Sequence, residues 1–211
     1  MKHAVIAGYA RSPFTLATKG ALARVRPDDI AAQVVAELVT RTGVTPEDIE
    51  ALVLGCAFPE GEQGLNVARL IGLLAGLPQS VGGYTVNHFC GSSMQAVHIA
   101  AGHIAAGMGE VFIAAGVESM SRIPMGGYNV LPNPALYAKV PGAYIGMGDT
   151  AENVARKWQI SRAEQEAFAL RSQARAAAAI AAGHLKDEIV PIKSRVGVVE
   201  VDGCPRPETP A

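Results

Sequence analysis

The residues best suited to chemistry lie in the segment Thr85–Ala96, which reads TVNHFCGSSMQA. A short apolar strand is expected to end at Cys90, and the Gly-Ser-Ser that follows is expected to open a long helix. A thiol at a helix N-terminus faces unpaired backbone N–H groups and the positive end of the helix dipole, which both favour the thiolate. The segment therefore predicts a nucleophile that could take up an acyl group and pass it on.

Gly91 adds to this pattern but does not decide whether Cys90 is a nucleophile. A glycine lets the backbone turn sharply and come close to a ligand, and the N–H groups of such a turn could hold a developing oxyanion. A lone cysteine in an apolar chain is, however, also common as a small buried hydrophobe. From position alone, both interpretations of Cys90 stay open.

The other two cysteines carry no comparable pattern. Cys56 lies inside the apolar run 51–57 and is expected to be buried, whereas Cys204 lies in a Pro-rich stretch. Three cysteines without a Cys-x-x-C pair argue against a disulfide framework and against a zinc site, so no metal is expected. The apolar stretch after Met1 is too short for a secretory signal, so we expect a cytoplasmic protein with reduced thiols.

A nucleophilic cysteine usually needs a base, and none of the five histidines is a convincing partner. His88 precedes Cys90 by two residues on the expected strand, where packing or exposure at an edge is the simpler interpretation. His98 and His103 lie two or more turns along the helix, too far to reach the thiol.

Strand and helix signals alternate around this segment. Continuous apolar runs predict strands, Pro27 and Gly43 bracket a helix, and the Cys90 segment opens another. The expected strands are 3–10, 51–57, 84–89 and 111–115, and the expected helices begin at 27, about 65 and 92. Strands that are apolar on both faces, with helices between them, indicate an α/β fold whose mostly parallel sheet is covered on both sides.

The pattern changes after Glu118. Residues 119–147 are rich in Gly, Pro, Met and Tyr and are expected to form a long loop. A helix is expected from about Thr150, and the capping-box pattern Ser161 to Glu164 predicts a second, Ala-rich helix that ends near Gly183. Two short strands are expected within 188–201, before the Pro-rich stretch 205–211.

Composition excludes several classes of protein. The 18 Lys and Arg against 19 Asp and Glu leave a net charge of −1, which offers no electrostatic footprint for nucleic acid or an anionic membrane. Hydrophobic residues make up 49%, so the chain is not wholly disordered. No uninterrupted apolar run reaches the roughly 18 residues of a membrane-spanning helix.

Several ordered motifs resemble those of the thiolases. The segment VNHFCGSSMQA is similar to the active-site signature of that family, particularly of its degradative 3-ketoacyl-CoA thiolase branch. The further similar segments are Arg11–Phe14, Gly116–Ser121 with Pro124, Met147–Asn153 followed by Ser161, Arg162 and Gln165, Lys186–Pro191, and Arg206–Thr209. Together they cover nearly the whole chain.

The resemblance implies specific roles. Cys90 would carry the acyl group as a thioester between two coenzyme A molecules, and its own N–H would form part of an oxyanion hole. Met147 would line the pantetheine tunnel, and Arg206 would lie at the nucleotide end of coenzyme A, where a guanidinium suits phosphate or adenine. Coenzyme A thioesters would be substrates, and no covalently bound cofactor is implied. Gly146 stands where many short-chain biosynthetic members have His, which argues against an acetoacetyl-specific enzyme.

The resemblance also implies a layered α/β fold in two parts. Residues 1–118 would form the N-terminal core, and residues 119–211 an incomplete loop domain that covers coenzyme A. Thiolases continue into a second α/β half, which supplies an activating His, an Asn-containing motif and a second Cys. No segment here matches those elements, so that C-terminal half is expected to be absent.

Two hypotheses follow from the resemblance. The first is acyl transfer through Cys90, namely thiolysis of a 3-ketoacyl-CoA or the reverse Claisen condensation, in fatty acid metabolism. The alternative is a truncated or split thiolase-like protein that is inactive alone and binds only acyl-CoA or a partner subunit. A homodimer, a tetramer or a complementing C-terminal half is the expected partner. A ketoacyl synthase or sterol-carrier-type thiolase is a weaker interpretation, and a Cys hydrolase weaker still because no G-x-C-x-G surrounds Cys90.

Overall fold

The computed structural model describes residues 3–195 and 197–206, and it divides the chain into two compact units. The first unit comprises residues 1–128 and 187–204. The second comprises residues 129–186 and 205–211. Each unit is described separately below.

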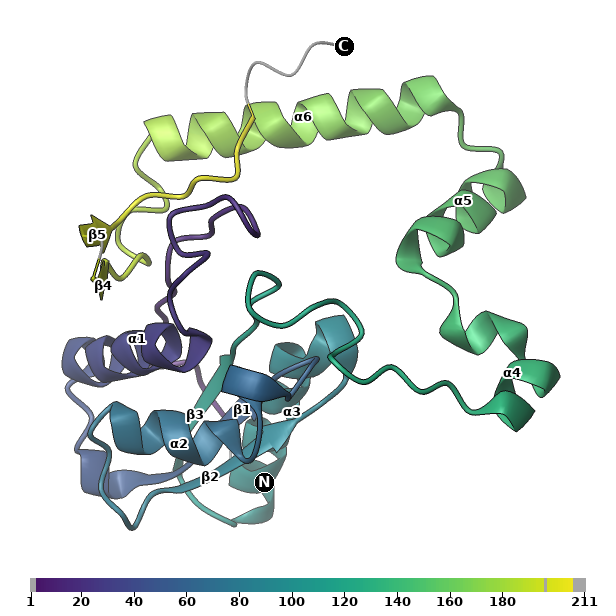
Figure 1. Cartoon of the computed structure of the whole chain (residues 1–211). Helices are drawn as coiled ribbons and strands as arrows, with labels where there is room; N and C mark the ends of the chain where they lie inside the picture. The colour runs from purple at the N-terminus through teal and green to yellow at the C-terminus, as the bar shows by residue number, and fades with distance from the viewer. Residues whose placement is uncertain (1–2, 196, 207–211) are drawn as a thin grey trace. The chain divides into compact units, whose positions relative to one another are not determined.

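The first unit is built from three helices and two small sheets, joined by short 3₁₀ turns (Figure 1). In chain order, its elements are α1 (Pro27–Thr42), η1 (Pro46–Asp48), β1 (Ile49–Gly55), η2 (Gly61–Gln63), α2 (Val67–Leu74), β2 (Gly82–Val86), η3 (Phe89–Gly91), α3 (Ser92–Ala106), β3 (Val111–Gly116), β4 (Ile192–Ser194) and β5 (Gly197–Val199). The alternation of strands and helices confirms the expected α/β class.

The main sheet is parallel, with β1 between β2 and β3. Gly55 at the end of β1 pairs with Val86 of β2 on one side and with Gly116 of β3 on the other. The carboxyl ends of all three strands therefore lie at one edge of the sheet. In α/β sheets this edge is where ligands bind.

Helices cover both faces of this sheet, as the apolar strands predict. Leu52 and Leu54 are fully buried and belong to one core cluster with residues of α1 and α2. The alternate residues of β1 point to the opposite face, where Gly55 lies against the first turn of α3. The strand is buried on both faces because a helix layer lies on each side of it (Figure 1).

The bounds of α1 follow from its terminal residues. Pro27 is the first helical residue, and Asp28 and Asp29 place negative charge in the first turn. Gly43 caps the helix in the left-handed conformation with φ of 64°, and its N–H donates to the carbonyl of Val39. Both expected helix signals are confirmed.

The expected strand at residues 3–10 is wrong. None of these residues belongs to a strand, and Val5 and Ile6 are 83% and 82% exposed. Only Arg11, which follows them, forms an isolated parallel bridge, to Ile189. An apolar run becomes a strand only where a neighbouring strand offers ladder hydrogen bonds, and within the described residues none is paired with this run.

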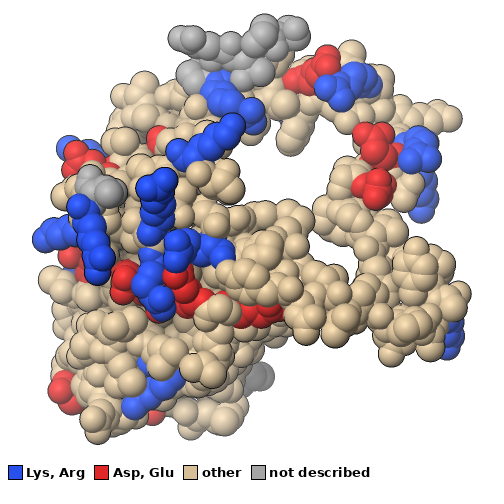
Figure 2. All heavy atoms as spheres, viewed as in Figure 1, with Lys and Arg blue, Asp and Glu red and all other residues tan. Residues whose placement is uncertain are grey.

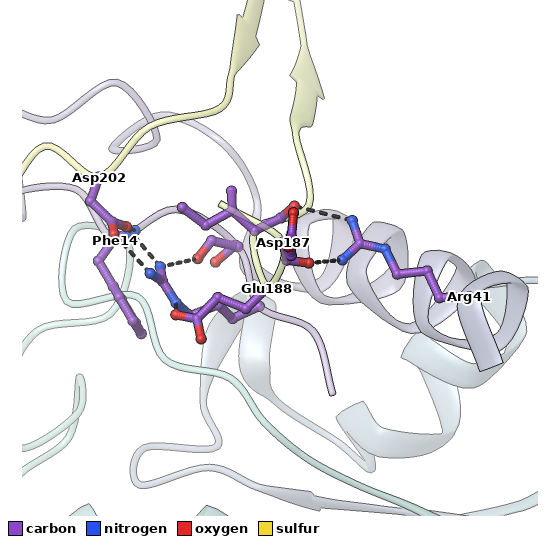
Figure 3. A network of polar contacts seen from close by, with 8 residues as sticks. Phe14, Arg41, Asp187, Glu188 and Asp202 are labelled. Carbon is purple, nitrogen blue, oxygen red and sulfur yellow. Dashed lines mark hydrogen bonds and ion pairs between the residues drawn. The ribbon is translucent and has the colours of Figure 1, made fainter. Parts of the chain in front are cut away.

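Arg11 ties the beginning of the chain to the segment after residue 186, whose Asp187, Glu188 and Asp202 are labelled in Figure 3. Its guanidinium donates to both carboxylate oxygens of Asp202, at 2.7 and 2.8 Å, and to Glu188 at 2.6 Å. The hydrogen bonds from Arg11 to Asp202 lower the pKa of that carboxyl. Arg41 of α1 holds the same returning segment by donating to the carbonyls of Asp187 and Ile189.

The second unit contains three α-helices and one 3₁₀ turn among its described residues. They are α4 (Pro134–Lys139), η4 (Pro141–Tyr144), α5 (Met147–Trp158) and α6 (Arg162–Ala181). The capping box at Ser161 and Glu164 is formed as expected, and hydrogen bonds from Ser161 lower the pKa of that carboxyl. Neither α5 nor α6 contains a buried residue, and the capping box defines the start of α6.

The expected loop over residues 119–147 is partly wrong, because α4 interrupts it. Asn133 is the N-cap, its side chain accepts a hydrogen bond from the N–H of Leu136, and Pro134 is the first helical residue. Likewise α5 begins at Met147, three residues before the expected start. The two short strands expected within 188–201 are confirmed as the antiparallel pair β4 and β5.

Charged side chains of opposite sign lie next to one another on the face shown in Figure 2. Ion pairs join three parts of the first unit. Arg26 contacts Asp28 at 2.6 Å and Glu62 at 3.4 Å, and Glu62 also pairs with Arg122. Hydrogen bonds from Arg122 lower the pKa of Glu62.

No helix within residues 3–195 and 197–206 has the length and apolar character needed to cross a membrane.

Candidate functional site

Cys90 lies where the carboxyl edge of the parallel sheet meets the N-terminus of α3. It occupies the middle of the 3₁₀ turn η3, four residues after the end of β2 and two residues before the first residue of the helix. The side chain is exposed. The expected order of strand, cysteine and helix is thus present, although β2 ends at Val86 and a tight turn separates it from Cys90.

Two glycines let α3 begin this close to the sheet. A Cβ built on Gly55 would lie 2.3 Å from the carbonyl carbon of Ser92 and from the nitrogen of Ser93. A Cβ built on Gly116 would lie 2.6 Å from Cβ of Ser93. Ordinary contacts between carbon atoms are about 3.5–4.0 Å, so any larger residue would push the helix away. The ends of β1 and β3 therefore fix the height of the helix N-terminus above the sheet.

The turn that carries Cys90 has an unusual backbone. Phe89 has φ of 45°, in the left-handed region that bulky residues rarely adopt. Such a conformation costs on the order of 1–3 kcal/mol and persists only when surrounding contacts hold it. Here the ring of Phe89 contacts that of Phe58, with centroids 6.0 Å apart.

Side chains on both sides of Phe89 form hydrogen bonds with the backbone N–H and carbonyl groups of this turn. The amide oxygen of Asn87 accepts from the N–H of Phe89 at 2.9 Å, and Asn87 Nδ2 donates to the carbonyl of Ala57 at 2.9 Å. The hydroxyl of Ser92 accepts from the N–H of His88 at 2.8 Å and donates to the carbonyl of Phe89 at 2.6 Å. Sequence reasoning missed both residues, although an Asn and a Ser flanking a tight turn are a known signal for such bonds.

A second set of hydrogen bonds, made by Glu118 and Gln63, holds the residue to which the turn is bound, Ala57. The N–H of Ala57 donates to Glu118 at 2.7 Å, and the other oxygen of that carboxylate accepts from Gln63 at 2.7 Å. Gln63 is fully buried, and its amide oxygen accepts from the N–H of Ser119 at 2.6 Å. Ala57 therefore links two parts of the site. Its carbonyl accepts from Asn87 of the Cys90 turn, and its N–H donates to Glu118, which follows β3.

Cys56 is buried, as expected, and differs chemically from Cys90. Burial raises the pKa of its thiol to about 11, and the nearby charge of Glu118 acts in the same direction. Gln63 Nε2 lies 3.4 Å from its sulfur. The thiol of Cys56 is therefore protonated at neutral pH and packs as part of the core.

The histidines lie as the sequence suggests. His88 is exposed, and its ring borders Gly91, since a Cβ built there would lie 3.8 Å from His88 Nδ1. His103 packs edge-on against Phe112 and lies 3.4 Å from the hydroxyl of Tyr84. Within residues 3–195 and 197–206, no histidine is hydrogen-bonded to the Cys90 thiol.

The other two predicted site residues belong to the second unit, whereas Cys90 belongs to the first. Met147 is the first residue of α5 and is 68% exposed. The N–H of Arg206 donates to the side chain of Gln173 on α6 at 2.8 Å. The remainder of the motif that begins at Arg206, residues 207–209, lies outside the described residues. In the described part of the chain, no cluster of three or more His, Cys, Asp or Glu could hold a metal ion.

This arrangement suits nucleophilic chemistry at sulfur. The thiol is accessible, and it stands before a helix of 15 residues whose first N–H groups face the turn. Those groups and the helix dipole favour negative charge on a carbonyl oxygen under attack.

Comparison with known proteins agrees with this geometry. Residues 4–211 match the family described as "Thiolase, N-terminal domain". The chain is 50% identical over 205 residues to a 3-ketoacyl-CoA thiolase of Bacillus subtilis (strain 168), covering 97% of this chain and 52% of that protein. A 3-ketoacyl-CoA thiolase of Psychrobacter cryohalolentis is 42% identical, over 98% of this chain and 54% of its own length.

A third relative carries a different substrate in its name. The 3-oxoadipyl-CoA/3-oxo-5,6-dehydrosuberyl-CoA thiolase of Escherichia coli (strain K12) is 44% identical, over 90% of this chain and 53% of that protein. The chain spans about half the length of these curated relatives. On the family match and these identities, the chain belongs to the thiolase family.

Proposed function

We propose that this chain carries the nucleophile of an acyltransferase that moves an acyl group between coenzyme A thiols through a thioester at Cys90. The Cys90 thiolate attacks the ketone carbon of a 3-ketoacyl-CoA, and the bond between that carbon and the α-carbon breaks. The departing carbanion takes a proton and leaves as acetyl-CoA. The thiol of a second coenzyme A then attacks the enzyme thioester, releases the shortened acyl-CoA and restores the Cys90 thiol. The reverse sequence is a Claisen condensation.

One observation carries this proposal: an exposed thiol stands at the N-terminus of α3 in a chain of the thiolase family. Nucleophilic catalysis needs an accessible sulfur whose anionic form is favoured. Cys56 is buried with a raised pKa, which disfavours it as the nucleophile. The names of the relatives support a 3-ketoacyl-CoA substrate and acyl transfer.

The proposal assigns roles to further residues. The N–H of Cys90 forms part of an oxyanion hole, Met147 lines the pantetheine channel, and Arg206 meets the nucleotide of coenzyme A. Residues 1–118 constitute the core part and residues 119–211 the loop domain over coenzyme A. The general base and the second, acid–base cysteine come from a complementing C-terminal half, and the protein assembles as a homodimer or tetramer. A cytoplasmic enzyme of fatty acid metabolism is the setting that this implies.

A second candidate function is a thiolase-like chain that is inactive alone and binds only acyl-CoA or a partner subunit. The observation that favours it is that no histidine among the described residues is hydrogen-bonded to the Cys90 thiol. Thiolysis of a 3-ketoacyl-CoA by the isolated chain, at the rate of the Bacillus subtilis relative measured in parallel, would exclude this candidate.

The nucleophile assignment is tested by competitive alkylation. The native chain is treated with a limiting amount of iodoacetamide at pH 7, and peptide mass spectrometry measures labelling at each of the three cysteines. We expect Cys90 to be labelled ahead of both Cys56 and Cys204, and prior incubation with coenzyme A to slow labelling at Cys90 alone. A Cys90 that reacts no faster than Cys204 would contradict the assignment.

A further inference from the structure

The turn that presents Cys90 is held by two side chains to which the thiolase match assigns no role. Asn87 and Ser92 lie on either side of the segment 88–91, and together they make four hydrogen bonds to its backbone and to Ala57. All four have donor–acceptor distances between 2.6 and 2.9 Å. Cys90 itself lies between the two residues, so any movement of the turn moves its sulfur relative to the helix.

The backbone of this turn would not keep its shape unaided. The left-handed φ of Phe89 is unfavourable for a residue with a large side chain. Both polar groups of the Phe89 residue are fixed, because its N–H donates to Asn87 and its carbonyl accepts from the hydroxyl of Ser92. The backbone N–H of Ser92 also donates to the carbonyl of Phe89, and the side chains of Asn87 and Ser92 add to this backbone bond in holding the strained conformation.

The two side chains also connect the turn to rigid parts of the fold. Ser92 is 4% exposed and is the first residue of α3, packed against Gly55 at the end of β1. Asn87 reaches the carbonyl of Ala57, whose N–H is bound by Glu118. The turn is thus fastened to the helix on one side and to the chain that follows β1 on the other.

We propose that Asn87 and Ser92 are positioning residues that hold the strained turn at Phe89 and thereby keep the Cys90 thiolate at the N-terminus of α3. The inference rests on the proposed function, because it concerns the nucleophile of that reaction. Loss of either side chain lets Phe89 relax to a common conformation and swings the sulfur away from the helix N–H groups. An interaction between an anion and a helix terminus is worth about 0.3–1 kcal/mol, which corresponds to about a two- to fivefold change in a rate that depends on it.

The test measures the alkylation rate of Cys90 by iodoacetamide at pH 7 and at pH 10 and takes the ratio of the two rates. Exposure of the sulfur affects both rates equally and cancels, so the ratio reports how well the site favours the thiolate. We expect Ser92→Ala and Asn87→Ala each to lower the ratio by about two- to fivefold. Ser92→Thr, which keeps the hydroxyl, is expected to restore the wild-type ratio.

Ser93→Ala is the matched control, because it removes the same hydroxyl from the next residue of the same helix turn. Its ratio is expected to equal that of the wild type. Thermal unfolding followed by circular dichroism establishes that each variant is folded. Asn87 is exposed, so Asn87→Ala carries the test even if Ser92→Ala does not fold.

The outcomes separate this inference from the proposed function. If wild-type Cys90 is labelled first but the ratio is unchanged in both Ser92→Ala and Asn87→Ala, the positioning role is refuted and the nucleophile assignment stands. If wild-type Cys90 is not labelled ahead of the other cysteines, the proposed function itself fails. A fall of similar size in Ser93→Ala would also refute the positioning role, because the effect would then not be specific to the hydrogen-bonded residues.

Discussion

Replacement of Gly55 by alanine tests whether close approach of strand and helix builds the site. The added methyl group would lie 2.3 Å from backbone atoms of Ser92 and Ser93. Since ordinary contacts are about 3.5–4.0 Å, the start of α3 must move by roughly 1 Å or more. Neither neighbour is the end of a flexible side chain, so the strand or the helix itself has to shift.

The expected cost is that of overpacking a core. Insertion of a methyl group into a well-packed site costs about 1–3 kcal/mol of unfolding free energy. Gly102→Ala, within α3, provides the control, because a Cβ at Gly102 meets no atom within 4 Å. Alanine in the interior of a helix is more stable than glycine by about 0.5–1 kcal/mol, so this variant should gain stability.

Urea unfolding monitored by circular dichroism measures both variants against the wild type. We expect the urea midpoint to fall for Gly55→Ala and to rise for Gly102→Ala, with unchanged slopes. The pH 7 to pH 10 ratio of Cys90 alkylation should fall for Gly55→Ala alone. An unfolding free energy for Gly55→Ala within about 0.5 kcal/mol of the wild type, the usual range for surface substitutions, would refute the close-approach argument.

Four further predictions concern other parts of the chain. Arg11→Met should lower the unfolding free energy by about 1.5–3 kcal/mol at pH 7, because the carboxylates of Asp202 and Glu188 lose their charged partner; urea unfolding checks this against Lys193→Met, an exposed lysine. Because Arg11 lowers the folded-state pKa of Asp202, that stabilisation is complete above the unfolded value of about 4 and is lost as the pH falls through the lower folded value. Unfolding between about pH 2 and 6 should show a smaller loss of stability in Asp202→Asn than in the wild type, because the lowered pKa values of Glu62 and Glu164 contribute equally in both. Ser161→Ala should cost about 1 kcal/mol by removing the cap of α6, seen as faster amide exchange in its first turn, and no change in exchange would contradict the capping role. Cys56 should resist iodoacetamide at pH 8 in the native chain and react in urea, since burial raises its thiol pKa to about 11; native labelling at the rate of Cys204 would show that it is not buried.

Much of the first unit could be predicted because its signals are local. The helix expected to begin at residue 92 starts at Ser92, directly after Gly91, and Gly107 ends it in the left-handed conformation. The strand β1 followed from a continuous apolar run, which is typical of a strand buried on both faces. The capping box of α6 likewise involves residues only three positions apart.

The features that could not be predicted depend on residues distant in the sequence. The apolar run 3–10 forms no strand because a strand needs a paired neighbour, and composition does not report whether one is available. The bond from Ala57 to Glu118 joins residues 61 positions apart, and that from Gln63 to Glu118 joins residues 55 apart. Only the folded sheet brings these groups together, so the support beneath the Cys90 turn had no signal in the sequence.

The left-handed φ of Phe89 is a further case. Glycine is the usual residue for this conformation, and Gly91 is available two positions later. The structure instead places the strain on Phe89, where bonds from neighbouring side chains hold it. The sequence therefore predicted the place of Cys90 before the helix but not the residue that bears the strain of the turn.

Transfer of an acetyl group to Cys90 is the most direct test of the central claim that this residue is the acyl acceptor. The chain is incubated with acetyl-CoA at pH 7 and digested at low pH to preserve thioesters, and mass spectrometry then locates the acetyl group. We predict one acetyl group on the peptide that contains Cys90, its removal on addition of coenzyme A, and no acetyl thioester in Cys90→Ala. An acetyl thioester at Cys56 or Cys204 instead, or none on a Cys90 that iodoacetamide labels readily, would contradict the account.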